Sequence, residues 1–183
     1  TPPGQHAIDL QQPGNPLIVM PTGSGKSPVI GEICRYAIET WKARVLVLAH
    51  RKELLEQNAD KIRAFLPALI PVGTYSAGLG RRDREQEVIC CGIQSVHGRA
   101  FEFGARNLVI IDEAHLVPDD GEGMYRTFLN DLREINPRLR VVGLTATPFR
   151  TGSGSLCRKD AIFQRICHET PIKPLIDDGW LCP

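Results

Sequence analysis

The stretch MPTGSGKS, residues 20–27, combines a glycine-rich turn with lysine and serine, residue types that bind phosphate. It follows the apolar residues 17–19 and matches the pattern G-x-x-x-x-G-K-[ST] except at its first position, where Met20 replaces glycine. Position 20 closes the preceding strand and need not touch phosphate, so the phosphate-facing part of the pattern is intact. The alternative is a Gly/Ser turn that precedes Lys-Ser by coincidence.

Between a strand and a helix, such a loop directs its N–H groups and the positive helix end at one point, where a di- or triphosphate binds. Gly23 and Gly25 permit close approach and positive φ angles. Lys26 would place a positive charge on the outer phosphates, and the hydroxyl of Ser27 would bind Mg²⁺. The predicted ATP-binding residues are Pro21, Thr22, Gly23, Ser24, Gly25, Lys26 and Ser27.

Two carboxylates, Asp112 and Glu113, come directly after the apolar residues 108–111. At a neighbouring strand end, Asp112 can hold Mg²⁺ together with Ser27, and Glu113 can orient and deprotonate the water that attacks the γ-phosphate. Alternatively, the pair is the N-cap and first turn of a helix, where acids are favoured anyway. Because the phosphate loop is also present, we favour the interpretation in which Lys26, Asp112 and Glu113 are catalytic.

The elements that must position these residues are short apolar runs between helical patterns. Continuous apolar runs are typical of strands covered on both faces, and they occur at residues 17–20, 45–49, 88–90, 108–111 and 141–144. Helical spacing predicts helices over residues 28–41, 52–66 and 124–135, the last stopped before Asn136-Pro137. We predict an α/β fold with a parallel sheet, which binds ligands at the carboxyl ends of its strands. Residues 150–160 are predicted to form a surface loop.

Composition places the chain among ordinary globular proteins. It has 183 residues, 42% hydrophobic and 23% charged, with a formal charge of +1 that neither favours nor excludes a nucleic-acid partner. No apolar stretch approaches the ~20 residues that span a bilayer, and the start is not a signal peptide, so we expect a cytoplasmic protein without membrane contact. The start also lacks Met, which suggests processing or an excised piece. The adjacent Cys90 and Cys91 are predicted to pack as small hydrophobes.

The motifs PTGSGKS, LVLAHRKELLEQ, GIQSV, IIDEAH and GLTATP resemble motifs I, Ia, Ib, II and III of superfamily 2 DEAD/DEAH-type helicases, in the same order and spacing. The wording of LAHRKELLEQ, YSAGLGRRD and GLTATPFR is most similar to the RadD-like bacterial and phage DNA helicases. The resemblance implies that residues 1–183 form one three-layer αβα P-loop (RecA-like) domain with a mostly parallel central sheet. This domain would be the first, ATP-binding lobe, with a second RecA-like lobe that is absent from this chain.

The resemblance also implies roles that spacing alone does not give. Spacing alone suggests that His115 is a packed or capping residue, whereas the family places it in a polar network with Thr145 and Thr147. This network would couple the ATP site to the nucleic-acid surface; the alternative is that the two threonines cap the turn before Pro148. Gln5 is matched to the adenine-reading glutamine upstream of motif I.

For nucleic acid, the resemblance points to His50, Arg51, Gln94 and Ser95, which would bind backbone phosphates without reading sequence. Many relatives carry Thr or Ser at the position of Gly92, so one hydroxyl contact is missing here. The arginines of residues 81–84 either extend this path or lie on a solvated helix.

We therefore expect ATP and Mg²⁺ as ligands, nucleic acid (DNA in preference to RNA) as partner, and an ATP-dependent helicase or translocase as the whole protein. Alternatives are a stand-alone nucleotide- or nucleic-acid-binding module and a translocase subunit of a restriction-type enzyme. A small-molecule kinase is disfavoured, because such enzymes need no TATP paired with DEAH. The sequence does not define the oligomeric state.

Overall fold

A computed structural model describes residues 13–118, 123–150 and 154–171 of the chain. Gln5 and the predicted C-terminal helix at residues 172–183 lie outside these ranges. No helix in the described ranges is long and apolar enough to cross a membrane.

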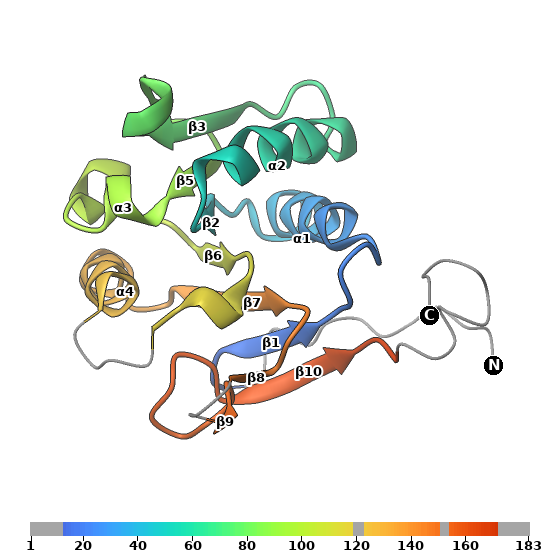
Figure 1. The fold of residues 1–183 in the computed structure, drawn as a ribbon. Helices are drawn as coiled ribbons and strands as arrows, with labels where there is room; N and C mark the ends of the chain where they lie inside the picture. Colours follow the sequence, from blue (N-terminus) through green and yellow to red (C-terminus); the bar gives the residue numbers. More distant parts are fainter. Residues whose placement is uncertain (1–12, 119–122, 151–153, 172–183) are drawn as a thin grey trace.

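Eight strands form one mixed, mostly parallel sheet, in the order β10-β1-β7-β6-β2-β5-β3-β4 (Figure 1). Only the β3–β4 pair in this sheet is antiparallel. The strands are β1 Pro16–Val19, β2 Val45–Ala49, β3 Val72–Ser76, β4 Arg81–Arg82, β5 Val88–Gly92, β6 Leu108–Ile111, β7 Arg140–Thr145 and β10 Arg165–Glu169. A separate antiparallel pair joins β8 Phe149–Arg150 to β9 Gly154–Ser155. The predicted α/β class and parallel sheet are confirmed.

Helices cover both faces of the sheet and make three layers (Figure 1). The helices are α1 Lys26–Trp41, α2 Lys52–Phe65, α3 Ile93–Val96 and α4 Met124–Ile135, and the 3₁₀ turns are η1 Ala77–Leu79, η2 Ala100–Phe103 and η3 Ala114–Leu116. One core cluster joins the sheet to α1 and α2, and a second joins its other face to α3, η2 and α4. Burial on both faces explains why the strands read as continuous apolar runs.

Alternate residues of the central strands belong to opposite cores, as the pleat requires. In β5, Cys90 packs on the α1/α2 side and Cys91 on the α3/α4 side, both fully buried. Burial raises the pKa of the Cys90 thiol to about 12 and also raises that of Cys91. Both cysteines are therefore neutral apolar residues, as predicted.

The structure differs from two local predictions. Arg81 and Arg82 form the exposed strand β4 against the end of β3, which contradicts the solvated helix but not the alternative that they extend the nucleic-acid path. In the segment predicted as a surface loop over residues 150–160, residues 158–160 are exposed, but Arg150 pairs with Gly154 and Leu156 is buried in the core. A single buried leucine among Gly and Ser residues does not produce a detectable hydrophobic period, which explains this miss.

Candidate functional site

The site lies at the carboxyl ends of β1, β6 and β7, where the sheet order places β7 between the other two strands. The loop after β1 leads into α1, and the turn after β6 leads into η3. The N–H of Met20 donates to the carbonyl of Thr145 (2.8 Å), and the N–H of Asp112 donates to that of Leu48 (2.9 Å). These bonds fix the start of each loop to a neighbouring strand.

Glycine geometry shapes the loop before α1. Gly23 and Gly25 have φ angles of 82° and 92°, which side-chain-bearing residues rarely adopt. Gly25 is the N-cap of α1, and a Cβ there would meet nothing closer than 3.9 Å, so the backbone can be approached closely. The N–H and hydroxyl of Ser24 both donate to the carbonyl of Pro21 (3.2 and 2.6 Å), which folds the loop on itself.

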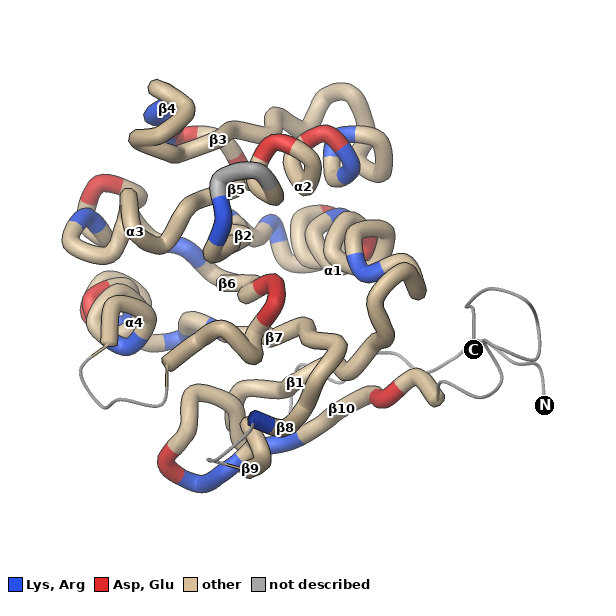
Figure 2. Tube along the Cα trace, in the orientation of Figure 1, with Lys and Arg blue, Asp and Glu red and all other residues tan. Residues whose placement is uncertain are grey.

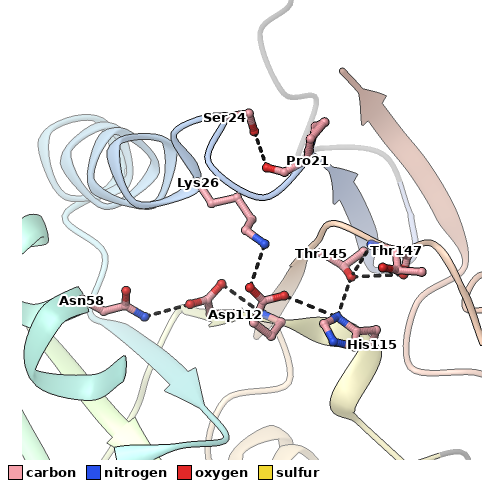
Figure 3. Close-up of polar contacts among 9 residues, drawn as sticks. Pro21, Ser24, Lys26, Asn58, Asp112, His115, Thr145 and Thr147 are labelled. Atoms are coloured by element: carbon pink, nitrogen blue, oxygen red, sulfur yellow. Dashed lines mark hydrogen bonds and ion pairs between the residues drawn. The ribbon is translucent and has the colours of Figure 1, made fainter. Parts of the chain in front are cut away.

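The two predicted catalytic motifs meet through an ion pair. Lys26 Nζ, in the first turn of α1, lies 2.7 Å from Glu113 Oε1, and the two side chains are 11% and 24% exposed (Figure 3). Glu113 itself adopts a left-handed backbone with φ of 51°, an uncommon conformation for a residue with a side chain. This backbone directs its carboxylate back toward α1, so the lysine of one motif and the acid of the other share one site.

Asp112 is held by a contact that sequence reasoning missed. Its Oδ2 accepts from Asn58 Nδ2 of α2 (2.8 Å), and its Oδ1 accepts from the N–H of Glu113 (3.0 Å) (Figure 3). Burial raises the pKa of Asp112 and the neighbouring Glu113 adds to this, whereas the Asn58 hydrogen bond and Lys26 lower it. The net rise in the pKa means that burial disfavours the charged form of Asp112 by more than the Asn58 hydrogen bond and Lys26 favour it.

The raised pKa of Asp112 predicts that Asp112→Asn stabilises the nucleotide-free chain at neutral pH. An acid with a raised folded-state pKa favours folding only while protonated, so stability is lost as pH rises through that pKa. We expect the melting temperature to rise; in a chain of this size each ~1 kcal/mol of added stability raises it by about 2–4 °C. Thermal unfolding measured at falling pH should show the gain disappearing as Asp112 of the wild type becomes protonated. A gain that persists unchanged at acid pH would contradict this explanation.

His115 connects residues 112–117, which we call the DEAH turn, to the segment after β7. Its Nδ1 lies 3.0 Å from Thr145 Oγ1 and 3.3 Å from Glu113 Oε2 (Figure 3). Thr145 Oγ1 also accepts from the N–H of Thr147 and donates to its carbonyl, both at 3.1 Å. Thr145 therefore caps the local turn and also contacts His115, whereas the coupling role of this network stays a prediction. Thr147 takes part through its backbone, and its side chain is exposed.

The surroundings of His115 Nδ1 favour the tautomer with the hydrogen on this atom. The Glu113 carboxylate, 3.3 Å away, only accepts hydrogen bonds, and the Thr145 hydroxyl can accept from Nδ1 while it donates to the Thr147 carbonyl. The Nδ1–H of His115 then points between the carboxylate of Glu113 and the hydroxyl of Thr145, and these two contacts orient the imidazole.

The predicted nucleic-acid residues lie on neighbouring strand ends. Arg51 is the exposed N-cap of α2, and His50 precedes it with a buried Nδ1 that has no hydrogen-bond partner in the part of the chain that the structure describes. Gln94 and Ser95, in α3, line a pocket of about 590 Å³. Ser95 Oγ accepts from the N–H of Ala77 (3.0 Å), which ties α3 to the end of β3.

The same pocket is also lined by Arg82, one of the arginines considered as an extension of the nucleic-acid path, and by His97 and Arg99, to which the sequence analysis gave no role. Figure 2 shows that basic residues are spread over most elements, so charge alone does not distinguish this pocket. Gly92, the last residue of β5 and the N-cap of α3, has little space beside it: a Cβ there would lie 3.3 Å from Leu55 Cδ1.

The fold and this arrangement define the first RecA-like lobe of a superfamily 2 helicase. The family model described as "Type III restriction enzyme, res subunit" matches residues 5–150, and the chain belongs to this family.

Two curated proteins and a solved helicase structure are similar to this chain over three quarters or more of its length. It is 28% identical over 162 residues to the mouse protein named "ATP-dependent RNA helicase DHX58", covering 78% of this chain and 24% of that protein. It is 28% identical over 153 residues to "DEAD-box ATP-dependent DNA helicase Fancm" of Drosophila melanogaster, covering 75% and 10%. The UvsW helicase of bacteriophage T4 superposes with a TM-score of 0.66 and 19% identity, covering 85% of this chain and 54% of that one. The chain thus spans a quarter or less of the length of the mouse and Drosophila relatives.

Proposed function

We propose that this chain is the ATP-binding lobe of an ATP-dependent nucleic-acid helicase or translocase. The observation that carries the proposal is the meeting of Lys26 and Glu113 at 2.7 Å, beside the His115–Thr145 contact. One contact joins the phosphate loop to the predicted base. The other joins His115, whose Nδ1 lies 3.3 Å from Glu113 Oε2, to the segment after β7 that would relay the state of the ATP site onward.

In the proposed site, the backbone of residues 21–25 and Lys26 bind the phosphates of ATP. The ion pair with Glu113 keeps Lys26 at the site before nucleotide arrives, and phosphate then competes with the carboxylate for the ammonium group. Opening of the Ser24–Pro21 contacts would release the Ser24 N–H for phosphate. Glu113 then orients and deprotonates the attacking water.

The residues present fit a magnesium ion. Ser27 follows Lys26 in the first turn of α1, and Asp112 is a buried carboxylate whose pKa is raised in the absence of a cation. Oxygen ligands of this kind are those that Mg²⁺ prefers. When bound, Mg²⁺ would neutralise charge on the β- and γ-phosphates. Asn58 keeps Asp112 oriented by its hydrogen bond.

For nucleic acid, the proposed interface runs from His50 and Arg51 to the pocket lined by Gln94 and Ser95. Arg82 and Arg99 extend it at the pocket wall. Such contacts bind phosphates and track a strand without reading its sequence. We propose DNA as the preferred partner, although one relative is named as an RNA helicase and another as a DNA helicase. The likeness to the RadD-like branch, which favours DNA, stays a prediction.

The whole protein would contain a second RecA-like lobe that closes over the nucleotide. An arginine supplied to the transferring phosphate accelerates hydrolysis by about 10³–10⁵ where it has been measured. The described residues place Lys26, Asp112 and Glu113 together, and the family supplies this arginine from the second lobe. The isolated 183-residue chain should therefore bind ATP weakly and hydrolyse it very slowly.

The test compares ATP hydrolysis by the full-length protein and by the isolated chain, with single- and double-stranded DNA and RNA of matched length. We expect stimulation of the full-length protein, greatest with DNA, and no robust stimulation of the isolated chain. Arg82→Ala should raise the nucleic-acid concentration needed for half-maximal stimulation, whereas Arg138→Ala, at the opposite ends of the strands, should not. Strong DNA-stimulated turnover by the isolated chain would contradict the two-lobe proposal.

The family description favours a specific alternative within the same chemistry, a translocase subunit of a restriction-type enzyme. Such a subunit would share the ATP site and differ in what the movement serves. Strand-displacement and translocation assays on the full-length protein separate these possibilities: a restriction-type translocase moves on duplex DNA without releasing a strand.

A further inference from the structure

Arg150 lies five residues after Thr145 and reaches back to the turn that carries the DEAH residues. Its Nε donates to the carbonyl of His115 (3.0 Å), and its Nη2 donates to the carbonyl of Val117. The side chain is half-buried where β8 begins the antiparallel pair with β9. Sequence reasoning gave this residue no role.

The contact satisfies groups that the turn leaves open. Backbone carbonyls at the end of a short helical turn lack partners within the turn, and η3 ends at Leu116 with Val117 as its C-cap. A positive charge is favoured at that end of a helical turn. The planar guanidinium can serve two carbonyls at once in a fixed geometry, which a lysine ammonium does not reproduce. Arg150 therefore fixes the backbone to which the His115 side chain is attached.

The DEAH turn and residues 145–150 are thus joined in two independent ways. One is the side-chain contact between His115 Nδ1 and Thr145 Oγ1. The other is the bridge from Arg150 to backbone carbonyls, which does not depend on the orientation of the imidazole. If the imidazole turns as Glu113 changes partner, the second connection still holds the two segments together.

Arg150 is itself anchored in the core through the β8–β9 pair. The N–H of Leu156 donates to the carbonyl of Pro148 (2.9 Å), and Leu156 is 4% exposed within the α3/α4-side cluster. Phe149, beside Arg150, exposes 61% of its surface. The bridge therefore connects the ATP-site turn to a partly exposed strand pair that is followed directly by a core residue, Leu156.

We propose that Arg150 is a positioning residue, whose guanidinium bridge holds the DEAH turn in register with Thr145 and links the ATP site to the β8–β9 hairpin. The inference rests on the proposed function, because it assigns Arg150 a part in coupling hydrolysis to nucleic acid. Arg150 does not touch the reacting atoms; it acts through the backbone of His115.

The first experiment measures nucleic-acid-stimulated ATP hydrolysis by the full-length protein carrying Arg150→Ala, Arg150→Lys or the control Arg138→Ala. We expect Arg150→Ala to lower stimulated kcat by about 10- to 100-fold, the range that ~1 Å misplacement near a catalytic group produces, with KM for ATP nearly unchanged. Arg150→Lys should restore part of the loss, and the exposed Arg138→Ala should match wild type. If Arg150→Ala weakens ATP binding, lowers turnover and lowers the melting temperature together, the role of Arg150 is merely structural and the proposal is overturned.

The second experiment uses amide hydrogen exchange in the isolated chain and does not depend on ATP hydrolysis. The N–H groups of Leu116 and Val117 are bonded within η3, so they report directly on the turn. We expect them to exchange faster in Arg150→Lys than in wild type or Arg138→Ala, with distant strands unchanged. The lysine variant keeps the charge, so this measurement is available even if Arg150→Ala does not fold. If both amides exchange at the same rate in Arg150→Lys as in wild type, Arg150 does not hold this turn and the proposal is wrong.

These experiments separate two failures. If the full-length wild type shows no ATP hydrolysis with any nucleic acid, the proposed function fails while the exchange measurement still tests the bridge. If the wild type is active and Arg150→Ala keeps both its kcat and its exchange pattern, the proposed function stands and the inference about Arg150 is wrong.

Discussion

Replacing Glu113 with glutamine in the full-length protein is expected to leave ATP binding intact and to reduce hydrolysis by about 10²–10⁴-fold, the usual contribution of a general base. The amide preserves the size of the side chain but cannot take a proton from water. Hydrolysis should fall with every nucleic acid, because the lost step is chemical. The measurements are equilibrium titration with a fluorescent ATP analogue and steady-state phosphate release.

The structure also indicates in which direction Glu113→Gln should change the affinity for ATP. Glu113 holds Lys26 in an ion pair before nucleotide arrives, so its neutral replacement frees the ammonium for phosphate. ATP affinity should rise by up to about fivefold, the equivalent of ~1 kcal/mol for a partly exposed pair. Glu134→Gln, on the exposed side of α4, is the matched control and should change neither quantity. Undiminished hydrolysis by Glu113→Gln would remove Glu113 from its proposed role.

The sheet could be predicted from the sequence wherever strands are buried on both faces. All five apolar runs became strands of the central sheet, and the helix at residues 124–135 begins and ends as predicted. Such segments combine a strong apolar signal with clear stops, such as Asn136-Pro137 after α4. Local pattern and tertiary environment agree there, so one sequence is enough.

Three strands of the sheet escaped prediction: the two-residue β4, and β3 and β10, whose patterns are ambiguous. In β3, Thr74 and Ser76 are polar yet buried, and only pairing with other strands, of Thr74 with β5 and of Ser76 with β4, makes them strand residues. In β10, charged and apolar residues mix within five positions, because this strand lies at the edge of the sheet and is partly exposed. Neither segment has the continuous apolar run by which the other strands were identified.

Site residues could be predicted from the sequence where the chemistry requires them close together in one motif. They could not be predicted where the fold brings in a residue from a distant part of the chain. Lys26, Asp112 and Glu113 stand in compact motifs, and the structure brings Lys26 and Glu113 into contact. Asn58 and Arg150 reach the DEAH turn across 54 and 35 positions of sequence. No spacing rule links residues so far apart, so their roles appear only when α2 and the β8–β9 hairpin are placed beside η3.

Replacing Lys26 with alanine is expected to weaken ATP binding by about 10- to 100-fold, the loss of a charge-assisted hydrogen bond worth ~1.5–3 kcal/mol. The ammonium is the charged group that the structure already directs into the site, at 2.7 Å from Glu113. Titration of the isolated chain with nucleotide measures the effect, with Lys61→Ala on the exposed side of α2 as control. If Lys26→Ala binds ATP as tightly as wild type, the phosphate-loop assignment fails.

Combining the two substitutions tests the competition between carboxylate and phosphate for the same ammonium group. If Glu113→Gln raises ATP affinity by releasing Lys26, that gain must shrink when Lys26 is already alanine, since no ammonium remains to be released. A double-mutant cycle of ATP affinities isolates this coupling, which is expected because the two side chains are in contact. Equal gains in both backgrounds would mean that Glu113 acts on nucleotide directly, through charge repulsion, and that the ion pair does not regulate access to Lys26.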